Sequence, residues 1–147
     1  MRPLGCAFVA FVLALGCIKS GQSSQLISVS GTVTLDGKPL NYATVSFVPQ
    51  GNTPGHGGTG PTDVAGKYQV NYLRGGKGLL PGSYKVTISC FLMPDGKPPP
   101  PDVPVMQTKA DSVVPYQYSD INMTPLTAEV KAGGAPIDFS LKSGKKP

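Results

Sequence analysis

Apolar and polar residues alternate along most of the chain with a period of two. This pattern is typical of β-strands that bury one face, because successive side chains point to opposite faces of a sheet. Six strands are predicted in this way, and a seventh candidate lies near Val113 to Tyr116. The residues predicted to face inward are Ile27, Val29, Gly31, Val33 and Leu35; Ala43, Val45 and Phe47; Tyr68, Val70 and Tyr72; Tyr84, Val86, Ile88 and Cys90; Leu126, Ala128 and Val130; and Ile137, Phe139 and Leu141.

Turn-forming residues punctuate these runs. Asp-Gly between alternating runs is a strong hairpin signal, and Asp side chains bond backbone N–H groups two residues on. Gly133 and Gly134 predict a hairpin between the last two strands. Gly31 lies on the inward face, where a missing side chain permits close backbone approach. The turn residues predicted to serve geometry are Asp36, Gly37, Asp63, Gly66, Pro81 and Gly82.

Two segments lack alternation. Residues 52–61 are almost all Gly, Pro, Thr and Asn, which predicts a mobile loop. Residues 95–104 contain five prolines, four of them consecutive, which predicts a stiff exposed loop because proline cannot donate to a ladder. No segment longer than ten residues beyond the N-terminal part shows a helical period. The fold class predicted is all-β: one antiparallel sandwich of about seven strands over residues 26–143, followed by a tail at 144–147.

The N-terminus has the character of an export signal. Arg2 precedes an apolar run over residues 7–15, and small residues and then a polar stretch follow. A charged start, a short apolar run and a small-residue exit are typical of a secretory signal peptide, here residues 1–16. The apolar run is shorter than the ~20 residues that a membrane-spanning helix needs. Residues 17–25 then form a tether.

Cys17 ends a stretch, Ala14-Leu15-Gly16-Cys17, that resembles the lipobox of bacterial lipoproteins. The resemblance implies cleavage before Cys17 and lipidation of that residue. Ala14 stands where the lipobox prefers Leu, and the same residues satisfy an ordinary A-x-A-like cleavage rule. Two outcomes stay open: a membrane-anchored lipoprotein of the cell envelope, or a soluble periplasmic or secreted protein. In the first, the membrane is a partner through the N-terminus.

Charge and composition exclude some classes. The net charge of +5 comes from scattered lysines, so the clustered basic stripe of a nucleic-acid-binding protein is missing. The single histidine, His56, lies in a Gly/Pro-rich stretch that is a poor place for a catalytic base. The three cysteines, Cys6, Cys17 and Cys90, fit no zinc or redox spacing. The sequence therefore predicts no catalytic residues, no metal site and no cofactor, and it favours a protein that is not an enzyme.

Three motifs resemble carboxypeptidase regulatory-like domains, which have a transthyretin-like (prealbumin-like) sandwich. They occur in the family's order, and the later strands are similar to those of short planctomycete-type envelope lipoproteins. The resemblance implies this fold and no particular activity. The motifs are Val29-Ser-Gly31-Thr-Val-Thr-Leu-Asp36-Gly37-Lys-Pro-Leu-Asn-Tyr-Ala43-Thr-Val-Ser-Phe47, Thr62-Asp63-Val-Ala-Gly66-Lys67-Tyr68 and Leu80-Pro81-Gly82-Ser-Tyr84-Lys-Val86.

Enzymes with a similar general shape do not fit the residues present. Intradiol dioxygenases hold iron with two Tyr and two His, and hydroxyisourate hydrolases need more than one His and a C-terminal Tyr-Arg-Gly-Ser. This chain has one His and ends Ser143-Gly-Lys-Lys-Pro147. The expected function is a structural or interaction module of the envelope. The alternative is a glycan- or peptide-binding module using loops 52–61 and 94–112, with a candidate ligand surface of Tyr42, Tyr72, Tyr116 and Tyr118.

Overall fold

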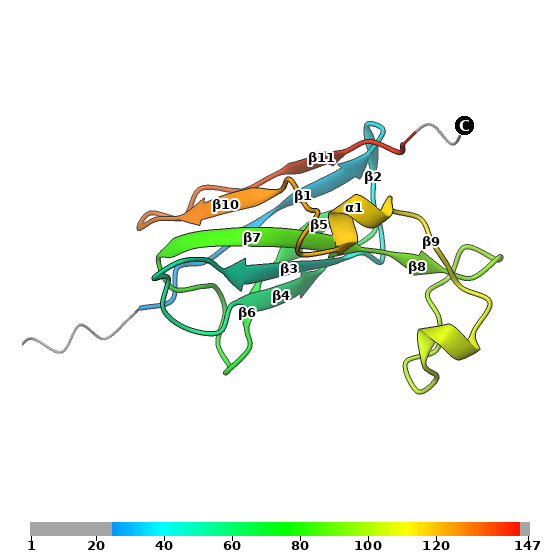
Figure 1. The fold of residues 1–147 in the computed structure, drawn as a ribbon, viewed down its shortest axis with the longest axis horizontal. Coiled ribbons are helices and arrows are strands. Elements are labelled where there is room, and N and C mark those ends of the chain that lie inside the picture. Colours follow the sequence, from blue (N-terminus) through cyan, green and yellow to red (C-terminus); the bar gives the residue numbers. More distant parts are fainter. Residues whose placement is uncertain (1–24, 145–147) are drawn as a thin grey trace, which may run out of the picture.

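The computed structural model describes residues 25–144, and in this range the protein is mostly β-strand with predominantly antiparallel sheets (Figure 1). The all-β prediction is confirmed. The predicted signal segment 1–16, Cys17 and residues 145–147 lie outside the described residues. The strands form a four-stranded sheet, a five-stranded sheet and a two-stranded ribbon.

The four-stranded sheet is built around β1 (Ser30–Leu35). One edge of β1 pairs in parallel with β11 (Phe139–Leu141), so the first and last strands of the body lie side by side. Its other edge pairs antiparallel with β5 (Lys67–Gln69) and then with β2 (Lys38–Pro39). Asp36 and Gly37 join β1 to β2 with positive φ angles of 51° and 80°, the two-residue turn that Asp-Gly favours.

The five-stranded sheet has the order β10-β7-β3-β4-β6. Its centre is β3 (Thr44–Pro49), which pairs along its whole length with β7 (Gly82–Ser89), the longest strand. β10 (Thr127–Val130) lies outside β7. On the other side, β4 (Gly58–Pro61) pairs with β3, and β6 (Asn71–Tyr72) is the edge.

The chain leaves the two sheets after β7 and returns before β10. β8 (Phe91–Leu92) and β9 (Asp111–Ser112) form the two-stranded ribbon, and a 3₁₀ turn η1 (Val105–Gln107) lies between them. A single helical turn, α1 (Tyr116–Ser119), then packs near β7. We call residues 91–113 the arm; in Figure 1 it extends to the right of the sheets.

One apolar core joins the two sheets. Val33, Phe139 and Leu141 of the four-stranded sheet share it with Val45, Val86 and Ile88 of the five-stranded sheet. Phe47 is at its centre: its ring lies 6.2–6.3 Å from the rings of Tyr68, Tyr84 and Phe139. The predicted inward residues are confirmed as buried or partly buried core. Sequence alternation missed five further buried hydrophobic residues outside the six predicted strands: Leu40, Leu79, Leu80, Val114 and Tyr118.

The prediction that residues 52–61 form one mobile loop is wrong for residues 58–61, which form β4. Gly58 and Gly60 are buried, and the backbone of residues 69–71 approaches them closely as the chain runs from β5 to β6. A Cβ on either glycine would lie 2.5 Å from a backbone oxygen, that of Asn71 or Gln69 respectively. The missing side chains of these glycines therefore permit the close approach of a neighbouring chain segment. The prediction of a loop, made from composition, did not anticipate this role.

The predicted strand from Tyr68 to Tyr72 is divided between the two sheets. β5 pairs with β1, whereas β6 pairs with β4, and buried Val70 lies at the crossing. This crossing closes one side of the core.

The predicted C-terminal hairpin is wrong. β10 pairs with β7 in one sheet and β11 with β1 in the other, so residues 131–138 pass between sheets. Gly31 permits this return: a Cβ there would lie 1.9 Å from the carbonyl oxygen of Ile137. Burying two apolar faces against the core outweighs the local turn signal. The close backbone approach predicted at Gly31 is confirmed.

The seventh strand predicted near Val113–Tyr116 is also displaced. β9 ends at Ser112, and α1 begins at Tyr116. Pro115, the residue before the helical turn, has no N–H to donate to a ladder, which favours a helix start over a strand. The expected count of about seven strands becomes eleven short ones within residues 25–144, since the crossing and the arm add small pieces.

Gly60→Ala tests the close crossing of β4. The new Cβ meets backbone, which cannot rotate away, so we expect the free energy of unfolding to fall by about 2 kcal/mol. Urea denaturation of the protein measures this loss. Gly144→Ala is the control, because its Cβ would enter open space; equal stability of the two variants would contradict the crossing.

Candidate functional site

Groups capable of catalysis are dispersed. No cluster of three or more His, Cys, Asp or Glu residues able to hold a metal occurs within residues 25–144. His56 is exposed, and its backbone N–H donates to the Tyr72 hydroxyl at 3.3 Å. No Ser–His–acid hydrogen bonds connect this histidine in the described part of the chain.

Cys90 is a buried free thiol at the end of β7. Its Sγ donates to the Asn41 carbonyl oxygen at 3.4 Å, and burial raises its pKa. A thiol held in its neutral form is a poor nucleophile. Cys90 therefore acts as a small core side chain, as its place in the alternation predicts.

The four candidate ligand tyrosines do not form one surface. Tyr42 is exposed just before β3. Tyr72 is partly buried on β6, opposite Gly58, which in turn pairs with Phe47 near the other end of β3. Along β3, Tyr42 and the position opposite Tyr72 are thus five residues apart, which is about 17 Å of extended chain.

Tyr116 and Tyr118 share α1 but differ in surroundings. The exposed Tyr116 hydroxyl donates to Asp120 Oδ2 at 2.7 Å, which raises the pKa of the tyrosine and lowers that of the aspartate. Tyr118 is buried, and its hydroxyl accepts the Lys142 N–H at 3.3 Å. Tyr118 thus ties α1 to the chain after β11, which leaves Tyr116 and Tyr42 as the accessible members of the set.

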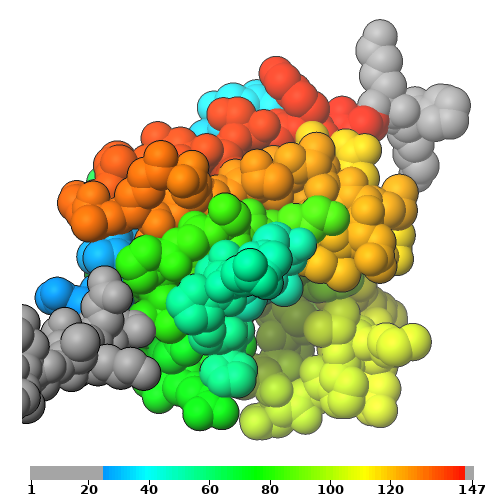
Figure 2. All heavy atoms as spheres, turned by 60° about the vertical axis from the view of Figure 1, so that its left-hand side comes forward, coloured from blue at the N-terminus to red at the C-terminus, as the bar shows by residue number. Residues whose placement is uncertain are grey.

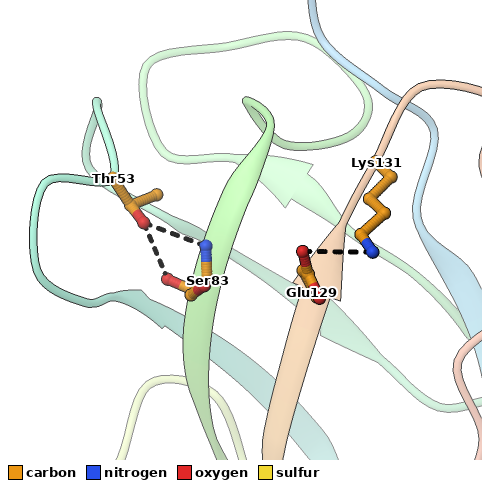
Figure 3. Close-up of polar contacts among 4 residues, drawn as sticks. All are labelled: Thr53, Ser83, Glu129 and Lys131. Atoms are coloured by element: carbon orange, nitrogen blue, oxygen red, sulfur yellow. Dashed lines mark hydrogen bonds and ion pairs between the residues drawn. The ribbon is translucent and has the colours of Figure 1, made fainter.

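Turn residues of the motifs make structural hydrogen bonds. Asp63 Oδ1 accepts the N–H groups of Ala65 and Lys67, both at 2.9 Å, and Gly66 takes a positive φ of 72°. Gly82, preceded by Pro81, begins β7 and packs against Thr53, whose hydroxyl accepts the Ser83 N–H at 2.9 Å (Figure 3). These residues shape the backbone.

Asp36 additionally joins the two ends of the body. Its carboxylate accepts bonds from the Ser143 N–H, at 3.0 Å, and from the Ser143 hydroxyl. These two bonds lower the pKa of Asp36, because they favour the ionised carboxylate. A turn residue after β1 thereby holds the chain that follows β11.

The arm carries four of the ten large hydrophobic side chains that are exposed within residues 25–144. Met106 is 99% exposed on η1, and Phe91, Val103 and Val113 are also exposed. Figure 2 shows the arm as a lobe standing out from the rest of the molecule. Exposed apolar residues gathered on one projection are typical of interaction surfaces. The sequence does contain a signal for this surface: Val103, Val105 and Met106 lie next to prolines and outside any alternating run. The prediction of a stiff exposed loop did not use these apolar residues.

An apolar cleft of about 370 Å³ lies at the other end of the sheets. Ile27, Val29 and Ile137 line one wall, and β10 with the 131–135 loop lines the other. It is the gap between the two sheets on the side that the β5–β6 crossing does not close. Its lining is mainly apolar, which gives it capacity for aliphatic groups, and Glu129 and Lys131 are the charged residues among those that line it.

Within residues 25–144, no helix has the length and apolar character needed to cross a membrane. Comparison with known proteins found no matching family model, no matching curated protein and no matching solved structure.

Acid titration tests the Asp36 link. Because its pKa is lowered from 3.8 in the folded state, Asp36 contributes stability above that pH and loses it as the pH falls through the lower folded value. We expect Asp36→Asn to flatten the acid-side loss of stability, measured as the urea midpoint against pH. Asp102→Asn in the exposed arm is the control; an unchanged acid profile for Asp36→Asn would contradict the link.

Proposed function

We propose that this protein is an exported, non-catalytic module of the cell envelope, held on a membrane by lipidated Cys17 and presenting the arm to a partner. The observation that carries the proposal is the separation of the two ends. Ile27 bonds Leu79, just before β7 begins, whereas the arm starts just after β7 ends. Eight strand residues, about 27 Å, therefore separate the start of the body from the arm.

This separation suits a spacer between an anchor and a binding element. The chain enters at the left in Figure 1, and the arm extends to the right. A lipid on Cys17 would hold the first end at the bilayer, since acyl chains add about 0.8 kcal/mol per buried CH₂. The arm would then face away from that bilayer.

The fold is proposed to be a transthyretin-like β-sandwich of the carboxypeptidase regulatory-like type. Its support is the use of the motif residues: Asp36-Gly37 forms the first turn, Asp63 and Gly66 form the second, and Pro81-Gly82 opens β7. Two sheets share one core around Phe47. These structural roles also favour a protein that is not an enzyme, because each motif residue forms a turn or begins a strand.

A second candidate function is peptide binding by the arm. Exposed Met106 favours it, since methionine adapts its shape to apolar partners. A glycan ligand would instead stack on aromatic rings; the arm offers Phe91, and Tyr116 follows shortly after the end of the arm. The arm, rather than the 52–61 segment, is the preferred surface, because residues 58–61 of that segment are built into β4.

Cys17→Ala tests the anchor. We expect the wild-type protein to fractionate with membranes and the variant to lose its acyl groups and its membrane attachment, because the lipid supplies the attachment. Mass spectrometry of the mature N-terminus identifies the cleavage site and the acylation state. Recovery of wild-type protein with an unmodified N-terminus in the soluble fraction would contradict the anchor.

Met106→Ser tests the arm. Met106 makes almost no contact with the rest of the chain, so we expect an unchanged melting temperature and at least a tenfold loss of binding to any peptide that an array selects, about 1.4 kcal/mol. Val64→Ser, at an 80% exposed residue outside the arm, is the matched control. Equal binding by both variants, or no ligand from peptide and glycan arrays, would argue against an arm-borne site.

A further inference from the structure

The loop between β6 and β7 carries an exposed apolar side chain followed by two cationic residues. Leu73 is 63% exposed, and Arg74 and Lys77 beside it are exposed as well. The loop is tightly bonded: the Gly75 N–H donates to the Tyr72 carbonyl oxygen, and the Tyr72 N–H to that of Gly76, both at 2.9 Å. Leu73 is thus presented to solvent by a defined turn.

This loop adjoins the start of the described chain. The Ile27 N–H donates to the Leu79 carbonyl oxygen at 2.7 Å, and the reverse bond is 2.9 Å. Gly76 lies against Leu26, whose Cδ1 would be 2.7 Å from an added Cβ. In Figure 1 the loop and the first described residues both lie in the left half of the molecule, away from the arm. The chain leading back to Cys17 therefore leaves beside the loop.

The charges of the loop are available to an external anion. Among residues 25–144 the one ion pair joins Lys131 Nζ to Glu129 Oε1 at 3.2 Å, so the acid at this end already has a cation (Figure 3). Arg74 and Lys77 make no ion pair within that range. The remaining acids lie in the turns at the far end of β1, in the arm, after α1 and beside Thr32: Asp36, Asp63, Asp95, Asp102, Asp111, Asp120 and Asp138.

We propose that the 73–77 loop docks on the anionic surface of the membrane that carries the anchor. Leu73 enters the head-group region, while Arg74 and Lys77 meet lipid phosphates. The proposal rests on the lipidated Cys17 of the proposed function. Residues 18–24 reach no further than about 25 Å when extended, so the anchor keeps this loop near the bilayer. Docking would fix the orientation of the body and direct the arm outward.

A site-specific fluorophore distinguishes docking from simple tethering. Leu73→Cys, labelled with an environment-sensitive dye, is placed by its native acyl anchor in phosphatidylcholine vesicles containing about a third phosphatidylglycerol. We expect blue-shifted emission and several-fold protection from iodide quenching. About 1 M salt, which shortens the Debye length to about 3 Å, should reverse much of the protection, and so should Arg74→Gln with Lys77→Gln.

The control label is Val64→Cys, which is also exposed, at 80% against 63% for Leu73, but lies in the Asp63 turn beside Val33, at the far end of β1. This label should stay quenchable. If the protein sediments with the vesicles but both labels are quenched alike, docking is overturned and the anchor stands. If the protein stays in the supernatant and its N-terminus carries no lipid, the anchor fails and the proposal fails with it. Protection of the Leu73 label on purely zwitterionic vesicles would contradict the role of the two cations.

Discussion

The structure depends on one apolar core shared by two small sheets. Neither sheet is self-sufficient: β5, β6 and β11 have three residues or fewer, and such strands gain stability only by packing. Phe47 contributes from one sheet and touches Tyr68 and Phe139 of the other. Because β1 pairs with β11, the ends of residues 30–141 belong to one sheet, so the body is completed only when its last strand arrives.

The core also determines on which side the space between the two sheets is closed and on which side a cleft remains. Gly58 and Gly60 let β5 and β6 cross closely on one side, and there the sheets are joined. On the other side the 131–138 connection spans the sheets and leaves the apolar cleft. The arm, by contrast, contributes little to the core, since its apolar residues Met106 and Val103 remain exposed. The two sheets therefore form the packed body, and the arm is a separate exposed projection from it.

The proposed anchor, docking loop and arm together describe an oriented spacer. The loop with Leu73 lies where the chain enters, and the arm lies beyond the end of β7. The turn residues of the sequence motifs have structural roles, Asp36 by holding Ser143 and Asp63 by closing its own turn. In this proposal, function depends on the distance between the docking loop and the arm, and therefore on the length of β7, which separates them.

Local patterning in the sequence determined the strands and their inward faces, because period-two alternation and Asp-Gly turns act between neighbouring residues. Val33, Phe47 and Ile88 were predicted inward and are buried, and Asp36-Gly37 forms the expected turn. Only the tertiary structure decided partners. β10 and β11 separate despite Gly133-Gly134, residues 58–61 become a strand, and the four tyrosines disperse. The physical reason is that strand pairing is decided by burial against residues distant in the sequence, and local alternation and turn-forming residues carry no information about those contacts.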